Sequence, residues 1–210
     1  SGVQNSVIAL ANVVAQTNIN SFGKAAMAGC GSYSKLEGFA FLPVTCFTQA
    51  LSTFVGQNLG AGKHDRVKRG VAFGVMCSCA LAEVIGLLCY FFAPQLIGFF
   101  SETQEAIRFG TEHMRTICLF YCLLALSHCI AAVMRGAGKA MVPMVTMMAC
   151  WCVLRVSYIT MALKVVNELT TVSWAYPLTW TCSSIIFLIY FFKVDWMHTF
   201  ERIEAAKSGS

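Results

Sequence analysis

Two rows of amide and hydroxyl side chains fall at helical spacing inside apolar stretches of the chain. The two rows consist of Asn5, Asn12 and Gln16, and of Thr45, Gln49 and Ser52. Residues four or seven positions apart share one face of an α-helix. Unpaired amides in hydrocarbon cost several kcal/mol each, so both faces should point at protein or water. They could form hydrogen bonds between helices, worth about 0.6 kcal/mol each, or line a hydrated cavity. Two such faces on neighbouring helices favour the cavity.

Three ionisable side chains inside the apolar stretches form a second candidate group, because charge at this depth is costly and usually functional or paired. Glu83 and Arg155 lie at similar positions along two stretches that run in the same direction, about 20 Å deep at ~1.5 Å per residue. We predict that they form an ion pair with a structural role. His128 shares a helical face with Tyr121. It could relay a proton, although a neutral packing histidine is the favoured interpretation.

The elements that position these residues must cross a membrane. Of the 210 residues, 57% are hydrophobic and 12% are charged, whereas a soluble domain carries roughly 25% charged residues. Apolar runs of about 20 residues match a ~30 Å hydrocarbon core, and continuous rather than alternating runs indicate helices. The sequence predicts an all-α integral membrane protein whose six spans are Val3–Ser21, Gly38–Gly56, Gly70–Ala93, Thr116–Met134, Met141–Leu163 and Ser173–Phe192.

These spans leave no room for a soluble domain. We expect one six-helix lobe over residues 1–192 and a cytoplasmic tail over residues 193–210. The chain begins at Ser1 without a basic segment before the first span. From this we expect no signal peptide and a fragment of a longer protein.

The basic residues predict the orientation. Nine of the fifteen lysines and arginines lie on the side of the short loop 57–70, five lie on the opposite side, and Arg155 lies within a span. Positive residues favour the cytoplasm, so the C-terminus is expected there. The net charge of +5 is then explained by orientation and not by nucleic-acid binding. The eleven cysteines lie inside spans except for Cys30, which is expected in an outer loop. They contain no C-x-x-C pair, so we expect no metal site and no disulfide framework.

The tetrapeptide Gly-Ala-Gly-Lys occurs twice, at Gly60–Lys63 and at Gly136–Lys139. Neither copy is a phosphate-binding loop, because Gln57 and Val133 stand where such a loop needs its first glycine. Glycine adopts the left-handed conformation readily, and lysine complements the negative end of a helix dipole. Both copies are therefore predicted to end a helix and to form a tight turn.

The surroundings of these turns resemble multidrug and toxic compound extrusion (MATE) transporters. Residues 54–63 (FVGQNLGAGK), with the basic Arg66–Arg69 stretch, resemble the signature after the eighth helix of that family. Residues 134–139 (MRGAGK), with Pro143, resemble the turn between its tenth and eleventh helices. The motif residues that carry the resemblance are Gly56, Gln57, Gly60, Gly62, Arg135, Gly136 and Gly138.

The resemblance implies the C-terminal lobe of a two-lobe, twelve-helix antiporter in a bacterial plasma membrane. Such a protein exports cationic, amphipathic drugs in exchange for Na⁺ or H⁺. Its expected partners are therefore a small cationic substrate, membrane lipid and the missing N-terminal lobe, with no cofactor beyond the coupling ion. The chain departs from the family at Ile8, where many members carry an acid, and its fourth span has no acid. The coupling acid is thus expected in the missing lobe.

Three alternatives remain open. A flippase for a lipid-linked precursor would need several cations for the phosphates, and only Arg155 lies deep in a span. A membrane enzyme lacks support, since no H-E-x-x-H, no G-x-S-x-G and no paired carboxylates occur in the spans. A non-transporting assembly subunit would explain a half-length chain.

Overall fold

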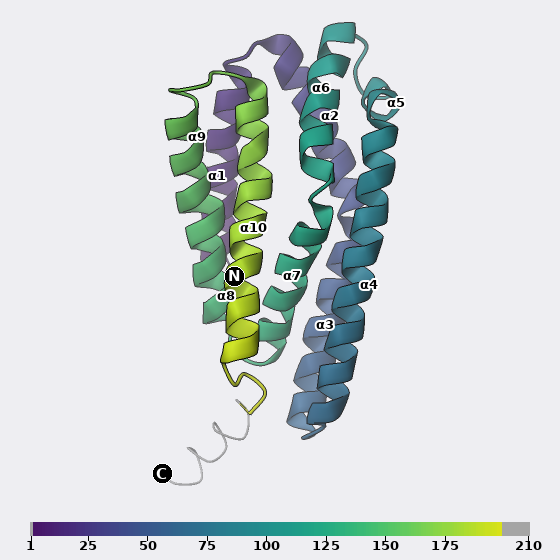
Figure 1. The fold of residues 1–210 in the computed structure, drawn as a ribbon, viewed down its shortest axis with the longest axis vertical. Coiled ribbons are helices and arrows are strands. Elements are labelled where there is room, and N and C mark those ends of the chain that lie inside the picture. Colours follow the sequence, from purple (N-terminus) through teal and green to yellow (C-terminus); the bar gives the residue numbers. More distant parts are fainter. Residues whose placement is uncertain (1, 199–210) are drawn as a thin grey trace.

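The computed structural model describes residues 2–198, which form a bundle of long helices joined by short turns (Figure 1). The helices are α1 (Gly2–Asn20), α2 (Lys24–Ala40), α3 (Leu42–Gly60), α4 (His64–Phe91), α5 (Ala93–Gly98), α6 (Gln104–Cys118), α7 (Tyr121–Gly136), α8 (Met141–Met147), the π-helix η1 (Met148–Leu154), α9 (Arg155–Ala162) and α10 (Leu169–Lys193). Residues 2–198 contain no strand, so the predicted all-α class is confirmed.

Most of the predicted spans correspond to long helical rods. Within residues 2–198, four rods are long and apolar enough to cross a membrane: Lys24–Gly60, His64–Phe91, Met141–Ala162 and Leu169–Lys193. The pair α6 and α7 makes a fifth if it counts as one span bent by 54°. Helix α1, which carries the first polar row, supplies the remaining rod. The prediction of a membrane-embedded helix bundle holds.

The predicted start of the second span is wrong. A helix already begins at Lys24 and continues, through a break at Phe41, to Gly60 as one 37-residue rod. Pro43 lies at the start of α3 and helps to set this break. Cys30, expected in an outer loop, is buried within α2. Residues 24–37 consist mostly of small and polar residues and carry charges at Lys24, Lys35 and Glu37, so they lack the continuous apolar run that predicts a span.

Close helix contact explains why this segment folds as a helix. A Cβ added at Gly29 of α2 would lie 2.6 Å from the backbone nitrogen of Gly110 in α6. Small residues allow helix backbones to approach in this way, which is the main packing device inside membranes. The α2–α6 contact therefore places α2 against the bundle along its length.

Both Gly-Ala-Gly-Lys segments end helices as predicted. Gly62 and Gly138 have φ values of +67° and +79°. Lys63 and Lys139 donate their backbone N–H groups to the carbonyls of Asn58 and Met134 at 2.8 and 2.9 Å. This is the Schellman pattern, which requires a left-handed residue just past the helix end.

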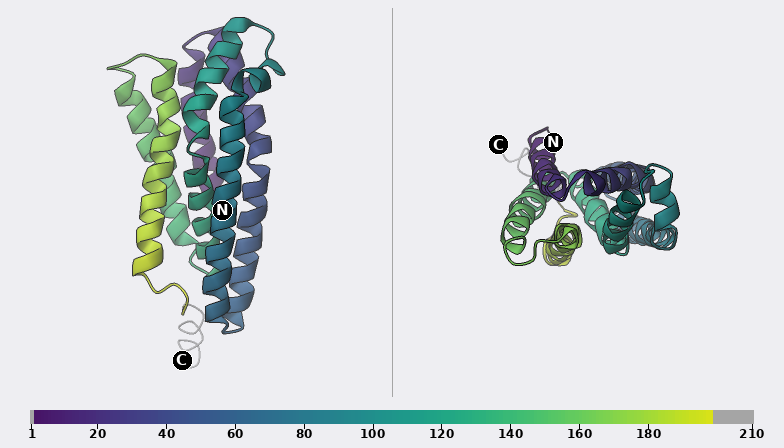
Figure 2. Two further views of the ribbon diagram at one scale, coloured as in Figure 1. Left: turned by 45° about the vertical axis from the view of Figure 1, so that its right-hand side comes forward. Right: turned by 90° about the horizontal axis from the view of Figure 1, so that it is seen from above.

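The turn after α3, the turn after α7 and the C-terminal end of α10 lie at the same end of the bundle (Figure 1). Seen along the bundle, α1 and α8–α10 gather at one side, and α2–α6 lie at the other (Figure 2). Helix α7 contacts α3, α4 and α10 and so connects the two groups.

Candidate functional site

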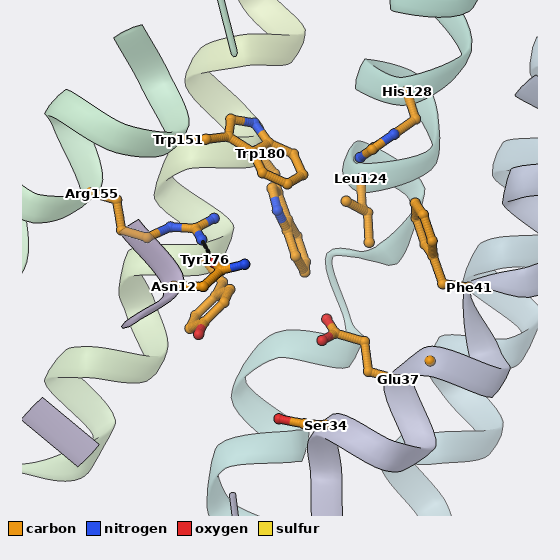
Figure 3. A pocket seen from close by; sticks show the side chains of 11 residues that line it. Asn12, Ser34, Glu37, Phe41, Leu124, His128, Trp151, Arg155, Tyr176 and Trp180 are labelled. Carbon is orange, nitrogen blue, oxygen red and sulfur yellow. Dashed lines mark hydrogen bonds between the residues drawn. The ribbon is translucent and has the colours of Figure 1, made fainter. Parts of the chain in front are cut away.

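A cavity of about 270 Å³ lies between these two groups of helices (Figure 3). Its wall draws on α1, α2, α7, η1, α9 and α10, so distant parts of the chain meet there. The lining residues are Asn12, Ser34, Glu37, Gly38, Phe41, Leu124, His128, Trp151, Arg155, Tyr176 and Trp180.

Arg155 is the positive group of the cavity and is only 1% exposed. Its Nη1 donates to Asn12 Oδ1 at 2.9 Å, and its Nη2 donates to Thr179 Oγ1 at 3.1 Å. The guanidinium lies 4.5 Å from the ring centre of Tyr176 and 5.3 Å from that of Trp151. Cation–π contact and two hydrogen bonds together hold this charge in one orientation.

Glu37 is the acidic group of the cavity, and it comes from α2 on the side opposite Arg155 (Figure 3). Its Oε1 accepts a hydrogen bond from the hydroxyl of Tyr33 at 2.9 Å. That hydroxyl also lies 3.3 Å from the hydroxyl of Tyr121 in α7. The carboxylate is thus positioned by a short chain of buried hydroxyls and points into the cavity.

Aromatic rings make up much of the remaining wall. The ring of His128 lies edge-on to Phe41 at 4.9 Å and to Trp151 at 5.2 Å. Trp151 Nε1 donates to Ser183 Oγ at 3.4 Å. This environment fits the packing interpretation of His128, and it also makes His128 part of the cavity wall. Aromatic faces of this kind attract flat organic cations.

The first predicted polar row is only partly at the cavity. Asn12 lines it and binds Arg155. Gln16 instead donates to Asn20 Oδ1 at 3.0 Å along its own helix. The side chain of Asn5 lies outside the described side chains.

The second predicted polar row does not line this cavity. Thr45 donates to the carbonyl of Phe41 in its own helix at 3.1 Å. Gln49 is exposed. Ser52 packs its backbone against Gly136 of α7. That this row lines a hydrated substrate cavity stays a prediction.

The predicted ion pair between Glu83 and Arg155 is wrong. Helices α4 and α9 lie on opposite sides of the bundle (Figures 1 and 2). Glu83 Oε2 accepts the backbone N–H of Cys122 at 3.3 Å, close to the start of α7. The carboxylate therefore accepts a backbone N–H at the bend between α6 and α7. A structural role for Glu83 stays a prediction, with this backbone group in place of Arg155.

Sequence reasoning missed Glu37 and the rings around Arg155. Glu37 lies just before the predicted second span, which starts at Gly38. Trp151 precedes Arg155 by four residues, and Tyr176 precedes Trp180 by four. Pairs at this spacing share a helical face, so the aromatic character of two faces was available in the sequence.

Comparison with known proteins gives the family. The MatE family profile matches residues 1–161. The chain belongs to the MatE family. Its motif residues fit this membership: Gly62 and Gly138 form the turns, and Gly56 and Gly136 lie at the close contact of α3 with α7. Gln57 and Arg135 are exposed next to these turns.

Individual relatives agree with this assignment. The probable multidrug resistance protein YoeA of Bacillus subtilis is 24% identical over 146 residues, which are 69% of this chain and 32% of the relative. The probable multidrug resistance protein NorM of Thermotoga maritima is 25% identical over 151 residues, or 68% of this chain and 32% of that protein. The chain thus spans about a third of the length of these relatives.

Solved structures show the same fold. A crystal structure of MATE in the bent conformation has a TM-score of 0.84 and 15% identity, covering 91% of this chain and 43% of that one. The MatE lobe described by residues 2–198 therefore has the architecture of less than half of a complete transporter of that fold.

Proposed function

We propose that this MatE chain is the C-terminal lobe of a secondary transporter that exports cationic, amphipathic compounds across the plasma membrane of a bacterium in exchange for Na⁺ or H⁺. The observation that carries the proposal is the cavity in which a carboxylate, Glu37, faces a wall of aromatic rings inside a membrane bundle. Aromatic rings and an acid are the groups that bind a flat organic cation. The relatives named as multidrug resistance proteins support the same activity.

A second lobe would complete the passage. The chain covers 43% of a MATE structure of the same fold, and in our proposal an N-terminal lobe would supply the rest. Gln49 and Asn12 are exposed here and would meet the substrate path between the lobes. The turns after α3 and α7 and the end of α10 would face the cytoplasm, in accord with the basic residues on that side.

Transport would follow from different affinities in two states. The two lobes would rock about the cavity, so that it opens alternately to each side. The substrate cation and the coupling ion would compete for Glu37, and each would stabilise a different state. A lipid-linked pyrophosphate is a weaker substrate, because Arg155 is the single cation among the residues that line the described cavity and Glu37 opposes it.

The proposal is tested with the complete protein in proteoliposomes and a fluorescent cationic dye. Sodium and proton gradients are imposed separately, and dye movement is followed in each. Glu37→Gln should lower transport about 10- to 100-fold, the effect expected on losing a charged contact worth ~1.5–3 kcal/mol. Glu102→Gln is the matched control, because Glu102 is exposed and outside the cavity, and it should transport normally. Dye transport that needs neither gradient, or a Glu37→Gln protein as active as the control, would contradict the proposal.

A further inference from the structure

A groove of about 760 Å³ lies at the surface of the bundle, along α6 and between the neighbouring ends of α4 and α10. Three charged side chains of α6 line it: Arg108, Glu112 and Arg115. They are four and three residues apart, so they share one face of the helix. All three are exposed, and none of them lines the cavity that holds Glu37.

The groove lies at the level where lipid headgroups meet the bundle. Glu112 Oε1 accepts a hydrogen bond from Thr170 Oγ1, in the first turn of α10, at 2.8 Å. Arg115 Nε donates to the carbonyl of Tyr90, in the last turn of α4, at 3.2 Å. Helices α4 and α10 are both long enough to cross a membrane, so their ends belong to the membrane–water interface. This interface is at the end of the bundle opposite the two Gly-Ala-Gly-Lys turns (Figure 1).

The three charges are held apart instead of pairing along α6. Opposite charges three or four residues apart can pair on a helix, yet the part of the chain that the structure describes contains no ion pair of Arg108 or Arg115. Glu112 is turned toward α10 by its bond to Thr170. Arg115 is turned toward α4, where its guanidinium lies 5.4 Å from the centre of the Tyr90 ring. The groove therefore presents positive and negative groups on different sides.

The terminal nitrogens of Arg115 are the donors that this arrangement leaves for a ligand. Tyr90 occupies Nε, and within residues 2–198 no hydrogen bond uses the two Nη atoms. A guanidinium binds a phosphate through two parallel N–H groups. Arg108 adds a second positive charge on the same helix face. The carboxylate of Glu112 accepts hydrogen bonds only, so its complement is a donor, above all an ammonium group.

Apolar side chains continue the groove toward the middle of the bundle. Trp174 follows Thr170 by four residues, and Leu119 follows Arg115 by four, so each lies about one turn farther from the helix ends. Trp174 is 46% exposed and Leu119 is 39% exposed. Tryptophan is enriched where the headgroups of a bilayer meet its hydrocarbon. Charges at the interface and apolar surface below them match the headgroup and the acyl chains of a phospholipid.

We propose that this groove binds a phospholipid whose headgroup carries a primary amine, as in phosphatidylethanolamine. The phosphate would lie at Arg115 and Arg108, the ammonium group at Glu112, and the acyl chains on Leu119 and Trp174. Phosphatidylcholine carries the same charges but has no N–H to donate to Glu112, and diacylglycerol has no phosphate. This inference goes beyond the proposed function and does not depend on it, because the three charged residues lie outside the cavity.

The test is native mass spectrometry of the purified, delipidated complete protein in detergent. Phosphatidylethanolamine and phosphatidylcholine with identical acyl chains are added together at equal concentration, and their occupancies are compared in one spectrum. The wild-type protein should hold phosphatidylethanolamine in about 3- to 10-fold excess. The excess is smaller than a buried charged hydrogen bond would give, because the groove is open to water. Diacylglycerol with the same chains should bind about 10-fold more weakly than phosphatidylethanolamine, since it lacks the phosphate.

Two groove variants and two controls separate the contributions. Glu112→Gln keeps an acceptor for Thr170 and removes the charge, so it should abolish the preference for phosphatidylethanolamine over phosphatidylcholine. Arg115→Gln should lower the occupancy of both phospholipids about 3- to 10-fold and leave that of diacylglycerol unchanged. Glu102→Gln and Arg69→Gln change exposed residues outside the groove, and both should match the wild-type protein.

Arg108→Gln provides a second test of the phosphate contact if Arg115→Gln folds poorly. Arg108 is exposed, and no hydrogen bond within residues 2–198 depends on its side chain. This variant should lower the occupancy of both phospholipids in the same direction as Arg115→Gln.

Three results would overturn the inference. A wild-type protein without preference between the two phospholipids, or a Glu112→Gln protein that keeps the preference, would show that Glu112 does not bind the amine. Diacylglycerol bound as well as the phospholipids would reduce the groove to an apolar surface. Displacement of the lipid by an equal concentration of glycerophosphoethanolamine would assign the groove to a soluble phosphate compound. Dye transport tests the proposed function separately, and it stands or falls independently of these three results.

Discussion

The two Gly-Ala-Gly-Lys segments provide a matched experiment on helix packing. Gly60 and Gly136 are the first glycines of the two copies, and each is the last residue of its helix. A Cβ added at Gly60 meets nothing within 4 Å, whereas a Cβ added at Gly136 would lie 3.1 Å from two backbone carbons of Ser52 and closer still to its carbonyl oxygen. Backbone atoms cannot change rotamer, so α3 and α7 would have to separate.

The expected cost follows from this overlap. Forcing an extra methyl group into a packed contact costs typically 1–3 kcal/mol. Alanine gains up to about 1 kcal/mol of helix propensity over glycine, but both variants share this gain, so it cancels in the comparison. Gly136→Ala should therefore be about 2 kcal/mol less stable than Gly60→Ala. At roughly 2–4 °C per kcal/mol for a chain of this size, Tm should differ by about 4–8 °C.

The assay is thermal unfolding of the purified complete protein in detergent. Unfolding is followed by tryptophan fluorescence and by the loss of the monodisperse peak in size-exclusion chromatography. Both variants are compared at one protein and detergent concentration. Gly31→Ala, in the middle of α2 with nothing within 4 Å of the added Cβ, should match Gly60→Ala or exceed it. Equal Tm values for Gly60→Ala and Gly136→Ala would show that α3 and α7 do not meet as closely as described.

Three further substitutions test the turns and the bend. Gly62→Ala and Gly138→Ala should each destabilise the protein by about 1–2 kcal/mol, because a side chain is strained at φ values of +67° and +79°. Thermal unfolding measures this loss. Variants as stable as the wild-type protein would exclude the left-handed turns. Glu83→Leu removes the acceptor of the Cys122 N–H and should lower stability by about 1–3 kcal/mol, while dye transport per folded molecule is kept. Folded yield and transport are measured on the same preparation, and a selective loss of transport would give Glu83 a functional role.

The parts of this fold that local sequence rules determine were predicted well. Continuous apolar runs specify membrane helices, and glycine followed by lysine specifies where two of them end. Those predictions depend on neighbours in the sequence. The start of α2 was missed because its stability comes from the contact of Gly29 with Gly110 in α6, more than eighty residues away by number, and no local pattern records that contact.

In the candidate site, too, local sequence patterns predict single residues but not the contacts between distant helices. Helical spacing selected Asn12, which lines the cavity, but it could not supply the partner, Arg155. The position of a residue along its span gives its depth in the membrane but not its place around the bundle. Glu83 and Arg155 have similar depths along their spans, yet their helices lie on opposite sides of the bundle, so equal depth did not bring them together.

Finding Glu37 changes the electrostatic argument for this lobe. The absence of an acid at Ile8 and in the fourth span assigned the coupling acid to another lobe. Helix α2 brings a carboxylate of this lobe to the cavity that Arg155 also enters. The formal charges of Glu37 and Arg155 sum to zero, but the two groups are held apart, because each is bound by its own hydrogen bonds. Because Glu37 and Arg155 stand on different sides of the cavity, Arg155 does not pair with Glu37 directly, and a cationic group would bind on the α2 side.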